Sequence, residues 1–169
     1  MRLSSLETVF LSLNAAHIKY LVAGGVAVIA HGYVRFTQDL DLVIGLDHAN
    51  LTEALRALER LGYRPRVPVA MADFADPEKR AHWIRAKNMI VFQLISDAHA
   101  TVPIDIFVSE PFVFDEEYRQ MMPYQLQPGL TVPVVSLNTL IEMKQEASRP
   151  NDLQDIRMLN RQLPNHPKP

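Results

Sequence analysis

The chain has 169 residues, of which 48% are hydrophobic and 21% are charged, and its net charge is −2. These values are typical of an ordinary globular protein and predict one domain over residues 1–163, followed by a disordered tail at 164–169. The charge gives no sign of an obligatory nucleic-acid or anionic-membrane partner. The chain has no cysteine, which excludes disulfides and thiolate metal sites. Because it shows no signal-peptide pattern and no apolar run long enough to span a bilayer, we expect a cytoplasmic protein without membrane contact.

The first quarter of the chain alternates between helical and strand patterns. Apolar residues at helical spacing between positions 6 and 13 predict an amphipathic first helix. The apolar run at 18–22 predicts a strand, and the glycines that follow predict a tight turn before a short helix over 26–32. A second strand is expected over 40–44, where apolar residues return after two aspartates.

The rest of the chain continues this mixture of helices and strands. Two segments rich in apolar and β-branched residues, 89–95 and 102–108, predict neighbouring strands, and a last strand is expected at 131–135. Apolar stripes and capping signals predict further helices over 50–61, from 76 onward, over 136–146 and over 152–162. The whole pattern predicts an α+β fold, in which helices pack against a small mixed β-sheet.

Three aspartates lie in segments that are otherwise apolar. Asp39 and Asp41 are two residues apart at the start of a predicted strand, so their side chains should project to the same face. Asp105 lies between apolar neighbours in a later strand. If the two strands are adjacent, the three carboxylates converge, and oxygen ligands of this kind suit Mg²⁺ or Mn²⁺. Ions held in this way can stabilise both the attacking and the leaving oxygen of a phosphoryl displacement.

A candidate phosphate site accompanies the acids. The turn at Gly24 and Gly25 has no side chains, so its backbone N–H groups could approach a phosphate at the start of the following helix. Arg35 and Thr37 precede the acid pair, and the guanidinium of Arg35 suits the geometry of a triphosphate oxygen. A surface arginine without such a role is the alternative interpretation of Arg35.

The order of these features resembles nucleotidyltransferases of the DNA polymerase β superfamily. Their signature is a Gly-Gly or Gly-Ser turn, a spacer, an Asp-x-Asp pair and a third carboxylate on a later strand; here the spacer has 13 residues (26–38). Asp39, Asp41 and Asp105 match the catalytic, metal-binding acids. The string HGYVRFTQDLDLV at 31–43 is similar to the AbiEii-type branch, which includes toxins of bacterial toxin–antitoxin pairs. The strings LIEMK at 140–144 and RPNDLQD at 149–155 resemble the C-terminal helical motif of that branch.

The resemblance implies an enzyme that binds a nucleoside triphosphate with Mg²⁺ or Mn²⁺. Such an enzyme would transfer a nucleoside monophosphate to an acceptor hydroxyl of a protein or an RNA, and an antitoxin is a possible partner. The resemblance also makes Lys144 a second phosphate ligand; the alternative is a lysine whose stem covers apolar surface while its amine stays in water. Asp152 and Asp155 are expected to orient Lys144 or Arg149, or only to cap their helix.

The chain departs from the family pattern at two points, and other functions remain open. Gly25 stands where many relatives have serine, and we expect no large C-terminal helical domain of the kind that binds the acceptor in bigger relatives. A catalytically silent nucleotide-binding or regulatory partner with the same fold is the competing class. A toxin that acts on tRNA would need a basic surface. Eight residues could supply it, namely Arg56, Arg60, Arg64, Arg66, Lys79, Arg80, Arg85 and Lys87.

Overall fold

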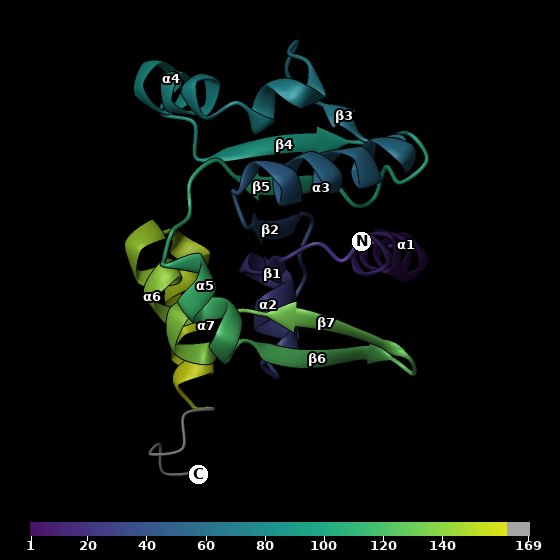
Figure 1. The fold of residues 1–169 in the computed structure, drawn as a ribbon. Helices are drawn as coiled ribbons and strands as arrows, with labels where there is room; N and C mark the ends of the chain where they lie inside the picture. The colour runs from purple at the N-terminus through teal and green to yellow at the C-terminus, as the bar shows by residue number, and fades with distance from the viewer. Residues whose placement is uncertain (162–169) are drawn as a thin grey trace.

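A computed structural model describes residues 1–161, and its centre is one seven-stranded mixed β-sheet (Figure 1). The strands are β1 (Tyr20–Val22), β2 (Leu40–Ile44), β3 (Arg64–Pro65), β4 (Val91–Ile95), β5 (Ile104–Phe107), β6 (Met122–Gln127) and β7 (Leu130–Val134). Their spatial order is β3-β4-β5-β2-β1-β7-β6. The pairs β2–β5 and β1–β7 are parallel, and the other neighbours are antiparallel. The predicted mixed sheet is therefore confirmed.

The helices cover this sheet and complete its hydrophobic core. They are α1 (Leu3–Ala15), α2 (Gly24–Ala30), α3 (His48–Arg60), the 3₁₀ helix η1 (Met71–Ala75), α4 (Pro77–Lys87), α5 (Phe114–Gln120), α6 (Leu137–Ala147) and α7 (Pro150–Asn160). The apolar stripe of α1 predicted from the sequence is buried, as are the leucines of α3. Helices α6 and α7 pack against each other beside the sheet (Figure 1). Within residues 1–161, none of the helices combines the length and the apolar composition needed to cross a membrane.

Several element boundaries differ from the sequence-based expectation. Helix α2 begins at Gly24, so the two glycines form its first turn instead of a separate turn before residue 26. Helix α7 begins at Pro150, because proline is well suited to the first turn of a helix. The end of the helix predicted to reach 162 and the tail predicted to be disordered at 164–169 lie outside the described residues.

Four elements were not predicted, and their sequences explain why. Strand β3 has only two residues, and η1 is a single short helix of five. Strand β6 is a half-exposed edge strand with a proline in it, paired only with β7, so it lacks a strong apolar pattern. Helix α5 carries acidic residues through its first turn and has seven residues in all.

Candidate active site

The segment between α2 and β2 is extended and directs the candidate residues to one side. Its exposure alternates from residue to residue between positions 33 and 39. Because successive side chains of an extended chain point in opposite directions, the alternation separates two sets of residues. The inward-facing, partly buried set is Tyr33, Arg35, Thr37 and Asp39, and the exposed set is Val34, Phe36 and Gln38.

The three predicted acids lie near one another at the centre of the sheet. Asp41 of β2 and Asp105 of β5 are partners in the parallel register of the two strands. Side chains at paired positions of neighbouring strands lie side by side on the same face, so these two carboxylates are neighbours. Asp39 lies one residue before β2. Its negative charge acts on both of the other acids and raises their pKa values.

The environment of Asp41 and Asp105 favours their neutral forms. Burial is the main cause that raises the pKa of Asp41 to about 6, and the neighbouring charge of Asp105 is the second. A hydrogen bond from the Gly25 amide and the positive charge of Lys144 act in the opposite direction. Burial also raises the pKa of Asp105, and a hydrogen bond from Gln93 counteracts it. Two like charges in this position would be stabilised by a cation between them.

The acids provide a partial donor set for a divalent cation. In the part of the chain described, residues 1–161, no group of three or more His, Asp or Glu side chains is arranged to hold a metal ion by itself. However, Mg²⁺ and Mn²⁺ fill much of their coordination with water and substrate phosphate oxygens. The paired oxygens of Asp41 and Asp105, flanked by Asp39, fit such an ion in their chemistry.

The two glycines make room for side chains of the site. A Cβ on Gly24 would lie 1.8 Å from Oδ2 of Asp41, and Gly24 has a φ of +58°, which disfavours other residues. A Cβ on Gly25 would lie 2.2 Å from Oγ1 of Thr37. The start of α2 is thus in direct contact with Asp41 and Thr37. The prediction that these glycines also contact a phosphate stays a prediction.

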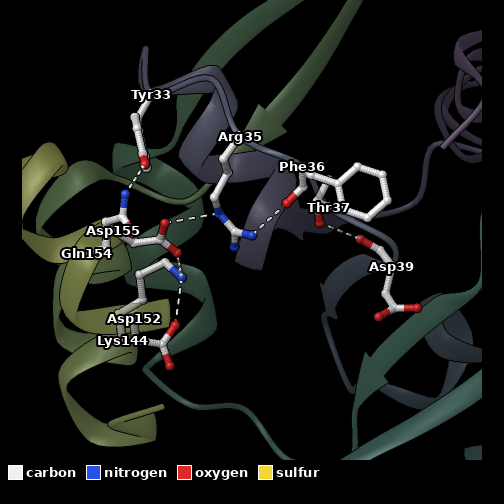
Figure 2. A network of polar contacts seen from close by, with 9 residues as sticks. All are labelled: Tyr33, Arg35, Phe36, Thr37, Asp39, Lys144, Asp152, Gln154 and Asp155. Atoms are coloured by element: carbon white, nitrogen blue, oxygen red, sulfur yellow. Dashed lines mark hydrogen bonds and ion pairs between the residues drawn. The ribbon is translucent and has the colours of Figure 1, made fainter. Parts of the chain in front are cut away.

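A buried group of ion pairs connects the extended segment to the C-terminal helices (Figure 2). Nε of Arg35 lies 3.0 Å from Oδ1 of Asp155, and Nζ of Lys144 lies 2.7 Å from Oδ2 of the same carboxylate. Nζ of Lys144 also donates a hydrogen bond to Oδ1 of Asp152 at 2.9 Å. Lys144 is only 6% exposed and Asp155 only 1% exposed. The amine of Lys144 is therefore buried in ion pairs and does not extend into water.

The contacts decide the expected roles of the two helical aspartates. Both orient Lys144, as one of the alternatives predicted. Asp152 in addition accepts a hydrogen bond from the backbone N–H of Arg149 at 3.1 Å, so it also caps α7. Asp155 instead joins α7 to Arg35.

Arg35 lies over the start of α2. Its Nη1 donates to the carbonyl oxygen of Phe36 at 2.9 Å, and its Nη2 lies 3.1 Å from the place where a Cβ of Gly25 would be. The side chain keeps 25% of its surface exposed. Arg35 is therefore held in place through Nε and Nη1 while part of its side chain stays exposed, which distinguishes it from a free surface arginine.

Sequence reasoning missed two residues beside Asp105. Nε2 of Gln93 donates to Oδ1 of Asp105 at 2.8 Å, and Arg66 donates in turn to the side-chain oxygen of Gln93. Gln93 is the polar residue in the apolar strand segment VFQLI, a signal that could have indicated it. Arg66 follows the two-residue strand β3 and has no such signal in the sequence.

Four of the eight residues considered for a tRNA-binding surface are paired with acids or buried. Arg80 is buried and donates to the carbonyl oxygen of Phe74 at 2.7 Å, so it is not part of a surface. Three other members pair with acids. These pairs are Arg56 with Glu53, Arg64 with Asp97, and Lys79 with Asp73. The other four residues, Arg60, Arg66, Arg85 and Lys87, form no ion pair within residues 1–161, so the tRNA hypothesis stays a prediction.

Solved structures with a similar fold include several nucleotidyltransferases. The lincosamide antibiotic adenylyltransferase LnuA, bound to lincomycin, matches with a TM-score of 0.64 and 16% identity over 95% of this chain and 97% of its own. A putative nucleotidyltransferase from Thermotoga maritima matches with a TM-score of 0.58 and 14% identity over 95% and 93%. ANT(2″)-Ia in complex with adenylyl-2″-tobramycin has a TM-score of 0.58 and 14% identity over 93% and 86%. At these identities the likeness shows the fold.

The family is established at the level of sequence. No curated protein sequence compared with the chain matches it significantly. The sequence model of the family described as "Nucleotidyl transferase AbiEii toxin, Type IV TA system" matches residues 6–168, nearly the whole chain. This match confirms the resemblance seen in the motifs around Asp39, Asp41 and Lys144. The chain belongs to the AbiEii family of nucleotidyltransferase toxins and is a nucleotidyltransferase.

Proposed function

We propose that the protein transfers a nucleoside monophosphate from a nucleoside triphosphate to an acceptor hydroxyl in a reaction that depends on Mg²⁺ or Mn²⁺. The observation that supports this proposal most strongly is the pairing of Asp41 with Asp105 against the first turn of α2. A partly buried carboxylate pair with raised pKa values is costly to keep charged, and it is expected at a site that receives a cation.

Each residue of the site has a proposed role. Asp39, Asp41 and Asp105 would hold the metal ion. The bound ion supplies charge neutralisation at the phosphates and lowers the pKa of the acceptor hydroxyl. Arg35 and Thr37, which lie over Gly25, contact the phosphates. We assign Lys144 a supporting role, because its ion pair with Asp155 keeps Arg35 in place.

The chemical step is an in-line displacement at phosphorus. The acceptor oxygen attacks the α-phosphorus, a new P–O bond forms, and the bond to the oxygen that bridges to the β-phosphate breaks. Pyrophosphate leaves with the electron pair of that bond. Asp105, whose pKa is raised by burial, could in addition help to accept the proton of the hydroxyl. Most of the rate acceleration then comes from positioning and charge stabilisation.

The acceptor and the partner follow from the family. A toxin of a toxin–antitoxin pair must modify a component of its own cell, so we propose a hydroxyl of a protein or an RNA as the acceptor and an antitoxin as the partner. LnuA and ANT(2″)-Ia are named for antibiotics, which are small molecules, and this use of the fold makes a small hydroxyl compound a third class to include in any test.

The test is transfer of label from each of four α-³²P-labelled nucleoside triphosphates to RNA, protein and small-molecule acceptors with Mg²⁺ or Mn²⁺. Replacing Asp39, Asp41 or Asp105 with alanine should reduce labelling by about 100-fold or more. Asp115→Ala, on the exposed side of α5, is the matched control and should leave labelling unchanged. Nucleotide binding that survives all three changes, with no label transferred by the wild type, would favour the catalytically silent partner.

A further inference from the structure

A chain of hydrogen bonds reaches the carboxylate of Asp105 from the edge of the sheet. Strand β4 alternates between buried and half-buried residues, and Gln93 is the polar residue on its half-buried side. Gln93 and Asp105 are partners in the antiparallel register of β4 and β5. Nε2 of Gln93 donates to Oδ1 of Asp105 at 2.8 Å. The pairing of β4 with β5 thus places the side-chain amide of Gln93 opposite one carboxylate oxygen of Asp105.

Arg66 determines which way the amide of Gln93 faces. The backbone N–H of Arg66 donates to the carbonyl oxygen of Gln93 at 3.0 Å, which fixes the end of β3 to β4. Nη1 of Arg66 also donates to the side-chain oxygen of Gln93. A guanidinium has only donors, so the amide must turn its oxygen to Arg66 and its NH₂ group to the acid. Two consecutive hydrogen bonds therefore fix the orientation of Gln93.

The consequence concerns the free oxygen of Asp105. A carboxylate has two oxygens and can rotate about the bond to its Cβ, so an unsupported acid presents either oxygen in many orientations. The hydrogen bond from Gln93 occupies Oδ1 and restricts this rotation. Oδ2 has no hydrogen-bond partner within residues 1–161 and is left for a ligand that also contacts Asp41, the register partner of Asp105.

We propose that Gln93 and Arg66 are positioning residues that orient Asp105 for metal binding. This inference rests on the proposed function, because it requires Asp105 to be a metal ligand. Partners that orient a metal ligand without touching the metal commonly affect metal affinity or activity by about 10- to 100-fold. Gln93 makes the direct hydrogen bond, so its loss should have the larger effect, and Arg66 should have a smaller effect in the same direction.

The experiment measures Mn²⁺ binding by electron paramagnetic resonance, in which the signal of the free ion reports the unbound fraction. Gln93→Leu should weaken binding by about 10-fold or more, while Gln125→Leu, an exposed glutamine in β6, should not change it. Arg66→Ala should weaken binding less, and Arg66→Lys should recover part of the loss because lysine can still donate to the amide oxygen. Arg64→Ala, two residues away in β3, is the matched control, because Arg64 pairs with Asp97 instead.

The outcomes separate this inference from the proposed function. If Asp105→Ala abolishes Mn²⁺ binding and Gln93→Leu leaves it intact in a folded protein, the positioning role is wrong and the proposed function stands. If Asp105→Ala itself leaves binding unchanged, the proposed function fails and the positioning role fails with it. A transferase assay adds a second readout. Excess Mn²⁺ should restore kcat in Gln93→Leu, whereas a general folding defect would not respond to the metal.

Discussion

Replacing Asp41 with asparagine should stabilise the metal-free protein while it removes transferase activity. Burial and the charge of Asp105 raise the pKa of Asp41 from 3.8 to about 6, so the folded protein holds the charged form at a cost. Asparagine has nearly the same shape and no charge, and its oxygen can still accept the hydrogen bond from the Gly25 amide. The substitution thus removes the cost and keeps most of the packing.

The size and sign of the effect follow from the pKa shift. Between pH 3.8 and about 6 the folded state keeps a proton that the unfolded state releases, so the contribution of Asp41 to stability falls as the pH rises through this window. Above about pH 6 the full penalty is present, roughly 3 kcal/mol from a shift of this size. The asparagine NH₂ group replaces a carboxylate oxygen beside the other acids, and this change in hydrogen bonding offsets part of the gain. We therefore expect a net gain in the free energy of unfolding of about 1–3 kcal/mol above pH 7 and almost none near pH 4.

The assay is urea unfolding at several pH values, with and without Mg²⁺. The gain in the free energy of unfolding of Asp41→Asn over wild type should grow between pH 4 and pH 7, and Mg²⁺ should reduce it by stabilising only the wild type. Asp115→Asn, on exposed α5, should show a difference within about 0.5 kcal/mol at every pH. An Asp41→Asn protein that is less stable than wild type at pH 8, or a gain that does not depend on pH, would refute the reasoning.

Three further changes test other contacts of the site. Gly25→Ser should lower the thermal stability, by about 1 kcal/mol or more, because its Cβ would meet Oγ1 of Thr37 at 2.2 Å; adding Thr37→Gly should restore it, and a single variant as stable as wild type would contradict this. Lys144→Met should cost about 3–5 kcal/mol in urea unfolding, since it leaves Asp155 without its closest cation; a loss below about 1 kcal/mol would show that the ion pair matters little. Arg35→Lys should raise KM for the nucleotide by about 10-fold with little change in Tm. The single ammonium group of a lysine cannot contact Asp155 and a phosphate at once, whereas a guanidinium has N–H groups that point in different directions. An unchanged KM would argue against a phosphate contact.

The sequence contained enough information to predict the mixed sheet and the acids, since both depend on local patterns. The two-residue spacing of Asp39 and Asp41 indicated that they face the same side of a strand, and apolar neighbours marked Asp105 as a further candidate. That β2 and β5 are neighbours is a property of the chain topology, which the sequence could only suggest through the family resemblance. The register that pairs the two acids residue for residue came from the structure.

The supporting contacts were harder to predict, because they join distant parts of the chain. The three-residue spacing of Asp152 and Asp155 indicated one helix face, and the structure shows Lys144 as their common partner. Their link to Arg35 crosses more than a hundred residues and leaves no trace in local spacing. Arg66 was considered only as part of a basic surface, whereas its side chain is used to orient Gln93.

The contacts between α7 and the segment that joins α2 to β2 have a consequence for synthesis of the protein. Asp155 pairs with Arg35, and Gln154 donates to the hydroxyl of Tyr33 at 2.8 Å (Figure 2), so the last helix forms part of the wall around residues from the first quarter of the chain. A nascent chain on the ribosome cannot make these contacts until residues 150–160 have emerged from the exit tunnel. The segment around Arg35 is therefore held in place only after these residues have been made, and a chain truncated before Pro150 would lack both contacts.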